Sequence, residues 1–119
     1  MSGDVDLRSR TKQFALRIVR LFRAFPRNEE ARVLGQQLLR SGTSIGANYR
    51  AACRSRSRAE FIAKLGIELE EANETVFWLE LLLEAGIISP QKLGSLAKEA
   101  DELTSIFVAS LRTAKHLSA

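Results

Sequence analysis

Apolar residues recur at alternating steps of three and four along four segments of this 119-residue chain. That spacing places them on one face of an α-helix, and no segment shows the alternation of a strand. The four stripes cover residues 7–25, 34–52, 62–83 and 93–117. Four amphipathic helices with short connections predict an all-α fold over residues 1–119: an antiparallel up-down-up-down four-helix bundle with left-handed packing.

Residues with known capping chemistry mark the ends of these helices. Pro26 predicts the end of the first helix, because the residue before a proline is driven out of the α region. Ser57 begins a capping box at the start of the third helix. Ser89 and Pro90 predict the start of the last helix, with the serine as its cap and the proline in its first turn.

The second helix carries small and polar residues where the other helices carry large apolar ones. Ser41, Ser44 and Asn48 are predicted to form a polar seam against the third helix. Gly42 and Gly46 allow two interpretations. Either the helix ends at Gly42 and a new one begins just after it, or the glycines let another backbone approach closely. The unbroken spacing through this stretch favours one long helix.

Charge is distributed unevenly along the chain. Residues 1–58 carry 13 Lys/Arg against four acids, a net charge of +9, and residues 59–119 carry five against ten, a net charge of −5. Twelve of the first 13 cations are arginines, whose planar guanidinium suits bidentate contact with phosphate or carboxylate. The alternative is that basic and acidic helices neutralise one another within or between subunits.

The arginines outline a candidate nucleic-acid-binding surface. Its members are Arg17, Arg20, Arg23, Arg27, Arg50, Arg54, Arg56 and Arg58. The aromatic residues lie mostly on the core stripes and Tyr49 is the one assigned near this surface, so stacking of bases on it has little support. We therefore expect any binding to be driven by phosphate contacts and to be indifferent to sequence.

The third helix is acidic and has a surplus apolar face. Glu68, Glu71 and Glu74 are expected on a solvated or partner-facing surface. Between the acids, three apolar residues point away from the main stripe and predict an interface between subunits, because a large exposed patch is unusual on a monomer. They are Phe77, Trp78 and Leu81.

No residue pattern supports an enzyme. The chain has one cysteine, Cys53, and one histidine, His116, and no Glu-x-x-His motif of the kind found in di-iron bundles. We therefore expect no catalytic residues, no metal, no cofactor and no small-molecule substrate. Apolar runs are only a few residues long and the N-terminus lacks a signal pattern, so no membrane association and a cytoplasmic location are expected.

Several motifs resemble those of the bacterial four-helix bundle proteins named after the 23S rRNA intervening sequence. They lie at residues 37–41, 44–49, 59–65 and 71–75, followed by Trp78 and Leu79. The resemblance implies an antiparallel four-helix bundle with a long second helix, assembled as a ring-like homopentamer. A more distant relative binds a reverse transcriptase and RNA in a retroelement, which implies RNA as a partner. Ala51 stands where the family commonly has glutamate, and Asn73 where it often has aspartate.

Two classes of function follow from these observations. The first is a nucleic-acid accessory protein, an oligomer whose arginines contact phosphates of RNA or DNA without catalysis. The second is a protein-interaction scaffold, whose basic and acidic faces serve self-assembly or bind an acidic protein partner. Arginines buried against the acids of the third helix would favour the scaffold, whereas exposed arginines on one continuous surface would favour nucleic-acid binding.

Overall fold

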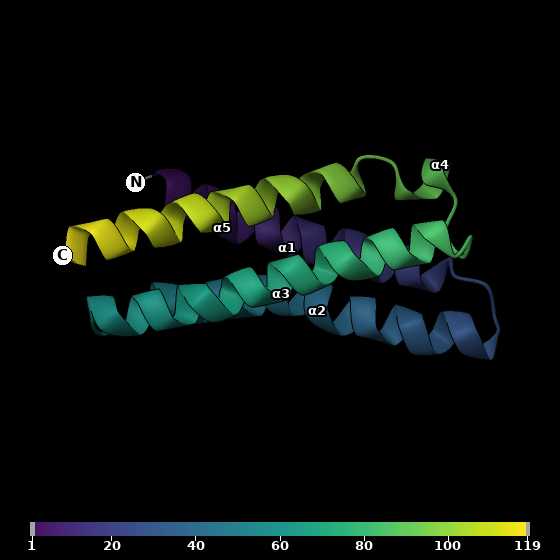
Figure 1. Cartoon of the computed structure of the whole chain (residues 1–119), viewed down its shortest axis with the longest axis horizontal. Helices are drawn as coiled ribbons and strands as arrows, with labels where there is room; N and C mark the ends of the chain where they lie inside the picture. Colours follow the sequence, from purple (N-terminus) through teal and green to yellow (C-terminus); the bar gives the residue numbers. More distant parts are fainter. Residues whose placement is uncertain (1, 119) are drawn as a thin grey trace.

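The chain folds into a bundle of helices, seen here in a computed structural model that describes residues 2–118, with the side-chain environments of residues 7–116. The helices are α1 (Ser2–Arg23), α2 (Glu29–Cys53), α3 (Arg58–Glu84), the short α4 (Pro90–Leu93) and α5 (Leu96–Ser118) (Figure 1). Between residues 2 and 118 there is no strand. The predicted all-α class is therefore confirmed.

The four long helices lie roughly along the long axis of the molecule, whose extents are 48 × 22 × 19 Å. α2 packs between α1 and α3, and α3 also packs against α5. Figure 1 shows the α1–α2 turn at one end of the axis and the α2–α3 turn at the other. The up-down-up-down topology and the left-handed packing stay predictions.

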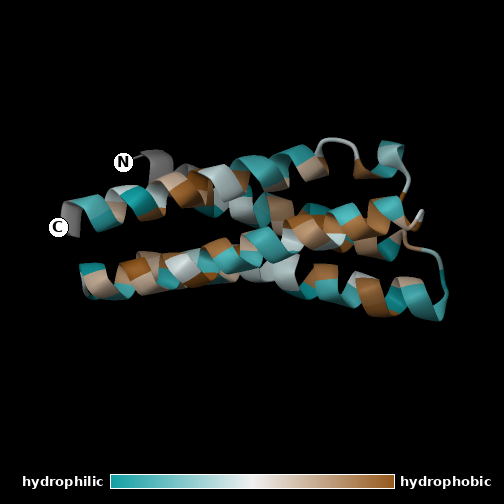
Figure 2. Ribbon diagram, viewed as in Figure 1, coloured by the Kyte–Doolittle hydropathy of each residue, from teal (hydrophilic) through white to brown (hydrophobic). Residues whose placement is uncertain are grey.

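The core is formed by the stripes that the spacing of apolar residues predicts. Phe14, Ile18, Leu38, Leu65 and Phe107 are at most 1% exposed. Figure 2 shows hydrophobic positions recurring along each long helix between hydrophilic ones. Burying a side chain of this size contributes roughly 1.5–3 kcal/mol to the free energy of unfolding.

The glycines of α2 lie inside a continuous helix, so the helix does not end at Gly42. They face α1. A Cβ atom on Gly42 would lie 2.9 Å from the side chain of Ile18, and one on Gly46 would lie 3.3 Å from the carbonyl oxygen of Thr11. The glycines therefore allow close approach of α1, which is the second of the two interpretations.

The last predicted helix is interrupted. Gly94 has φ +49°, a conformation that other residues rarely adopt, and it ends α4 after Leu93. α5 begins at Leu96, and both leucines are buried. The apolar spacing continues across the break, and so the sequence pattern gave no sign of it.

The buried face of α3 also differs from its predicted stripe. Glu68 and Thr75 are fully buried, whereas Leu69 and Val76 of the stripe are only partly buried. α3 contacts α2 and α5 on two sides, so residues beside the stripe are covered as well.

Candidate nucleic-acid interface

The eight candidate arginines do not form one continuous surface. The structure places them mainly in two clusters, which are the first-turn cluster (Arg20, Arg23 and Arg27) and the second-turn cluster (Arg50, Arg54, Arg56 and Arg58). The first surrounds the α1–α2 turn and the second the α2–α3 turn, at opposite ends of the 48 Å axis (Figure 1). Arg17 belongs to neither cluster, because it is half-buried and its Nη2 donates a hydrogen bond of 2.7 Å to Ser95 Oγ on the Gly94–Ser95 link before α5.

Ion pairs divide the arginines into two groups. Three arginines outside the candidate set are paired with carboxylates: Arg10 with Glu99 and Glu102, Arg32 with Glu29, and Arg40 with Glu71 and Glu74. Among the described side chains, none of the eight candidates forms such a pair. All members of the two clusters are exposed. Their guanidinium groups are therefore available for bidentate contact with a phosphate.

Local hydrogen bonds fix the turn that carries the second-turn cluster. The backbone N–H of Arg54 donates to the carbonyl oxygen of Ala51 at 3.1 Å and closes α2. Ser57 Oγ accepts from the backbone N–H of Glu60 at 3.1 Å and caps α3. The short turn between these caps places its arginines at the end of the bundle rather than along its side.

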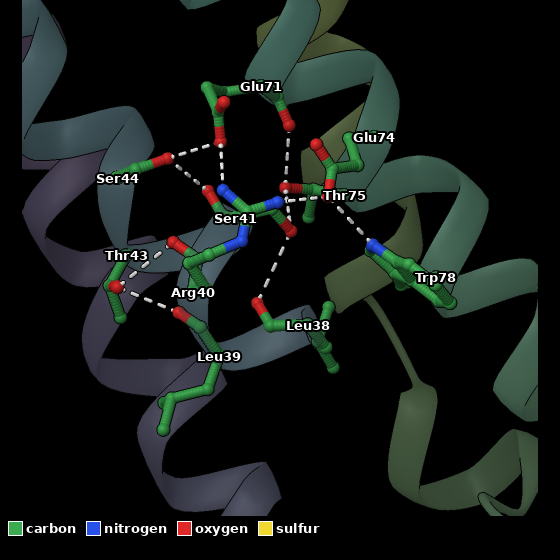
Figure 3. Close-up of polar contacts among 10 residues, drawn as sticks. All are labelled: Leu38, Leu39, Arg40, Ser41, Thr43, Ser44, Glu71, Glu74, Thr75 and Trp78. Carbon is green, nitrogen blue, oxygen red and sulfur yellow. Dashed lines mark hydrogen bonds and ion pairs between the residues drawn. The ribbon is translucent and has the colours of Figure 1, made fainter. Parts of the chain in front are cut away.

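A polar seam joins α2 to α3, and Figure 3 shows its side chains. Ser41 is fully buried, and its Oγ shares a hydrogen bond of 3.0 Å with Thr75 Oγ1. Ser44 Oγ lies 2.7 Å from Glu71 Oε1 and 2.8 Å from the carbonyl oxygen of Ser41. The hydroxyl groups of the seam thus find hydrogen-bond partners between the two helices. Ser41 contacts Thr75 and the later residue Ser44 contacts the earlier residue Glu71, so α2 and α3 run antiparallel here.

The remaining predicted member of the seam, Asn48, is half-buried. Its side chain forms no hydrogen bond with the other described residues. Ala51 is exposed, and Lys64 Nζ lies 3.5 Å from its carbonyl oxygen. The glutamate that the family resemblance implies at position 51 would thus lie on the surface beside Lys64, rather than complete the buried seam.

The outer end of the seam is an ion-pair network. Arg40 binds Glu71 at 3.2 Å and also Glu74, whose carboxylate accepts a hydrogen bond of 3.1 Å from the indole nitrogen of Trp78 (Figure 3). The hydrogen bonds from Trp78 and Arg40 hold the pKa of Glu74 below its ordinary value. Trp78 is half-buried against the core, so it is partly a structural residue.

The expectation that Glu68 faces solvent or a partner is wrong. Its side chain is 0% exposed, and neither carboxylate oxygen has a hydrogen-bond partner. Burial raises the pKa of Glu68 to about 8, with a further contribution from the negative charge of Glu71. The sequence contained one signal for this, because Glu68 lies three residues after Leu65 and four before Ala72, both of which are buried.

Comparison with known proteins gives the family of the chain. The sequence profile of the 23S rRNA-intervening sequence protein family matches residues 3–109. The chain belongs to this family. No curated protein sequence matches it.

A solved structure supports the same assignment. It is that of a protein with unknown function from the S23 ribosomal protein family of Bacteroides thetaiotaomicron, and it is 39% identical in sequence. The similarity covers 92% of this chain and 97% of that one, with a TM-score of 0.84. The fold of this member of the 23S rRNA-intervening sequence protein family is therefore shared with a protein of known structure.

Two further findings concern other kinds of site in this family member. Within the described part of the chain, no group of three or more His, Cys, Asp or Glu residues is arranged to hold a metal ion. Over the same residues, no helix combines the length and apolarity needed to cross a membrane.

The three predicted interface residues on α3 differ in exposure. Phe77 is 54% exposed, and its ring meets that of Trp78 edge-on with centroids 5.0 Å apart. Trp78 and Leu81 are each half-buried. Phe77 is therefore the member of this set that presents most of its surface to solvent.

Proposed function

We propose that this protein binds nucleic acid without catalysis, by contacting phosphates with its two arginine clusters. The observation that supports this most strongly is the selective pairing of arginines. Arg10 and Arg40 on the sides of the bundle, and Arg32 near the α1–α2 turn, are paired with carboxylates. The seven arginines of the two clusters, in contrast, are exposed and have no carboxylate partner among the described residues. Unpaired cations at fixed turns contact a phosphate backbone without reading its sequence.

Removing arginines from the second-turn cluster should weaken binding and reduce its salt dependence. Arg54→Ala with Arg56→Ala removes two phosphate contacts. The slope of log affinity against log salt should therefore become shallower by about two units, for a structured RNA and for duplex DNA alike. Fluorescence anisotropy over a salt series measures both the affinity and the slope.

A matched control separates position from net charge. Lys12→Ala with Lys98→Ala also removes two exposed cations, but from outside both clusters. This variant should keep nearly the parent slope. An unchanged slope in the arginine variant, or no detectable binding at low salt, would contradict the proposal and favour the scaffold function.

A second function, self-assembly, is favoured by the exposure of Phe77. We propose that the aromatic face of α3 is covered by another subunit in a homo-oligomer, with the ring-like homopentamer implied by the family resemblance as the expected state. An exposed aromatic ring beside charged residues is typical of an interface anchor. A cyclic ring also requires two different surfaces to meet, as the basic and acidic helices of this chain allow.

Phe77→Ser should shift the protein toward monomer. The substitution removes the most exposed aromatic surface of α3 without deleting a core side chain. Ile67→Ser is the control, since Ile67 is an exposed apolar residue of the same helix, at 52% exposure, and lies ten residues before Phe77, outside the aromatic face. Sedimentation velocity at about 20 μM measures the populations of monomer and oligomer, which depend on protein concentration. A parent protein that sediments as a monomer there would rule out the assembly.

A further inference from the structure

The first-turn cluster surrounds a surface cavity that combines aromatic rings with cations. The cavity has a volume of about 680 Å³ and lies at the α1–α2 turn. Its lining includes Phe22 and Phe25 together with Arg23, Arg27 and Arg32. None of the polar contacts of the α2–α3 seam reaches this end of the bundle.

The two phenylalanine rings rest directly on the backbone of α2. A Cβ atom on Gly35 would lie 2.7 Å from Phe25 and 2.9 Å from Phe22, so the glycine makes room for both rings. The ring centroids are 5.7 Å apart and the planes are tilted by 47°. The rings are therefore not stacked face to face, and both side chains are half-buried.

The charge of the cavity favours an anion. Arg23 and Arg27 are exposed and have no carboxylate partner among the described residues. Glu29 is the one acid in the lining, and Arg32 pairs with it at 2.9 Å. The two unpaired guanidinium groups therefore dominate the rim beside the rings.

We propose that this cavity binds an unpaired base of single-stranded nucleic acid, with the base packed on Phe22 and Phe25 and the flanking phosphates on Arg23 and Arg27. Proteins that bind single strands combine a positive groove with aromatic side chains on which bases stack. The inference rests on the proposed function, and it extends that function from phosphate contacts to a base.

The sequence gave base stacking little support, because Tyr49 was the one aromatic residue assigned to the neighbourhood of the arginines. Tyr49 is near the second-turn arginines in the chain, but it is only 3% exposed and packs against Phe107 with ring centroids 6.0 Å apart. It is therefore not available to a base. Phe25 was assigned to the buried stripe of α1, whereas its ring is only partly buried and lines the cavity.

Two pentanucleotides test the proposal: oligouridine, and an abasic chain with the same number of phosphates. The parent protein should bind oligouridine about tenfold more tightly, since stacking one base on an aromatic ring contributes about that much. Phe22→Leu with Phe25→Leu keeps apolar volume but removes the ring faces. It should reduce the affinity for oligouridine to that for the abasic chain and leave the salt slope unchanged. Arg23→Ala with Arg27→Ala should lower the affinity for both pentanucleotides.

A second variant gives a positive signal if the double leucine variant does not fold. Phe22→Trp places an indole in the cavity, and oligouridine should quench its fluorescence, with the parent protein and its one tryptophan as the background. Equal affinity of the parent for both chains would overturn the base site but leave phosphate binding standing. Failure of both to bind at low salt would overturn the proposed function itself. A polyglutamate peptide that outcompetes oligouridine would assign the cavity to an acidic protein.

Discussion

The Glu68→Gln variant is expected to be more stable than the parent protein by about 5 kcal/mol at pH 9 and nearly equal to it at pH 4. Glu68 is fully buried without a hydrogen-bond partner. Its carboxylate must therefore lose its hydration on folding without a compensating interaction. Glutamine has nearly the same shape and never ionises. Chemical denaturation at a series of pH values measures the difference.

The direction of this effect follows from the raised pKa of Glu68, about 8 against an ordinary value of 4.5. Below about pH 4.5 the group is protonated in the folded and unfolded chains alike, and it does not lower stability. As the pH rises toward 8, the unfolded chain releases the proton and the folded chain retains it, so the stability of the parent falls. Above about pH 8 the loss is complete.

Glu70→Gln is the matched control. Glu70 lies two residues along the same helix and is exposed, so the substitution removes one carboxylate from a position that water reaches. Its effect on the free energy of unfolding should stay within about 0.5 kcal/mol. If the difference between parent and Glu68→Gln does not change with pH, Glu68 is hydrated or paired in the folded protein.

Gly46→Leu should lower the free energy of unfolding by about 1–3 kcal/mol, and Gly42→Leu by a similar amount. At Gly46 the new side chain would meet the carbonyl oxygen of Thr11, a backbone atom that moves only if α1 moves. At Gly42 it would meet Ile18, which is fully buried. Thermal and denaturant unfolding of each variant measure the loss.

Gly66→Leu makes the same chemical change at a helical glycine with open space. Apart from its chain neighbours and the nearby backbone of α3 itself, no atom lies within 4 Å of a Cβ placed there. Leucine favours a helix more than glycine does, so this variant should be more stable by about 0.5–1 kcal/mol. Parent-like stability of Gly46→Leu would show that α1 and α2 do not pack closely at that position.

Helices were predictable from the sequence because their pattern is local. The alternating spacing placed Phe14 and Ile18 on the buried face of α1, and the capping role of Ser57 follows from its own hydroxyl group. The separation of the two arginine clusters was also accessible, since the 25 residues of α2 span roughly 37 Å at 1.5 Å each. The break at Gly94 was not predictable, because the buried leucines on either side of it, Leu93 and Leu96, keep the helical spacing.

The parts of the candidate site that the sequence did not predict depend on tertiary contacts. A spacing pattern identifies the centre of a buried face, but not how wide that face becomes when two helices cover it, as at Glu68 and Thr75. Ion pairs such as Arg10 with Glu99 join residues far apart in the chain, so the sequence could not separate neutralised arginines from available ones. The cavity likewise depends on Gly35 of α2 lying against Phe25 of the α1–α2 turn.

The position of the two arginine clusters at the ends of a rod sets a length scale for any ligand. A duplex advances about 3.4 Å per base pair, so the roughly 37 Å that α2 spans between the two clusters corresponds to about 11 base pairs. A shorter duplex can reach only one end of a subunit. A longer one can bridge both ends, and then its second contact forms at the high local concentration created by the first.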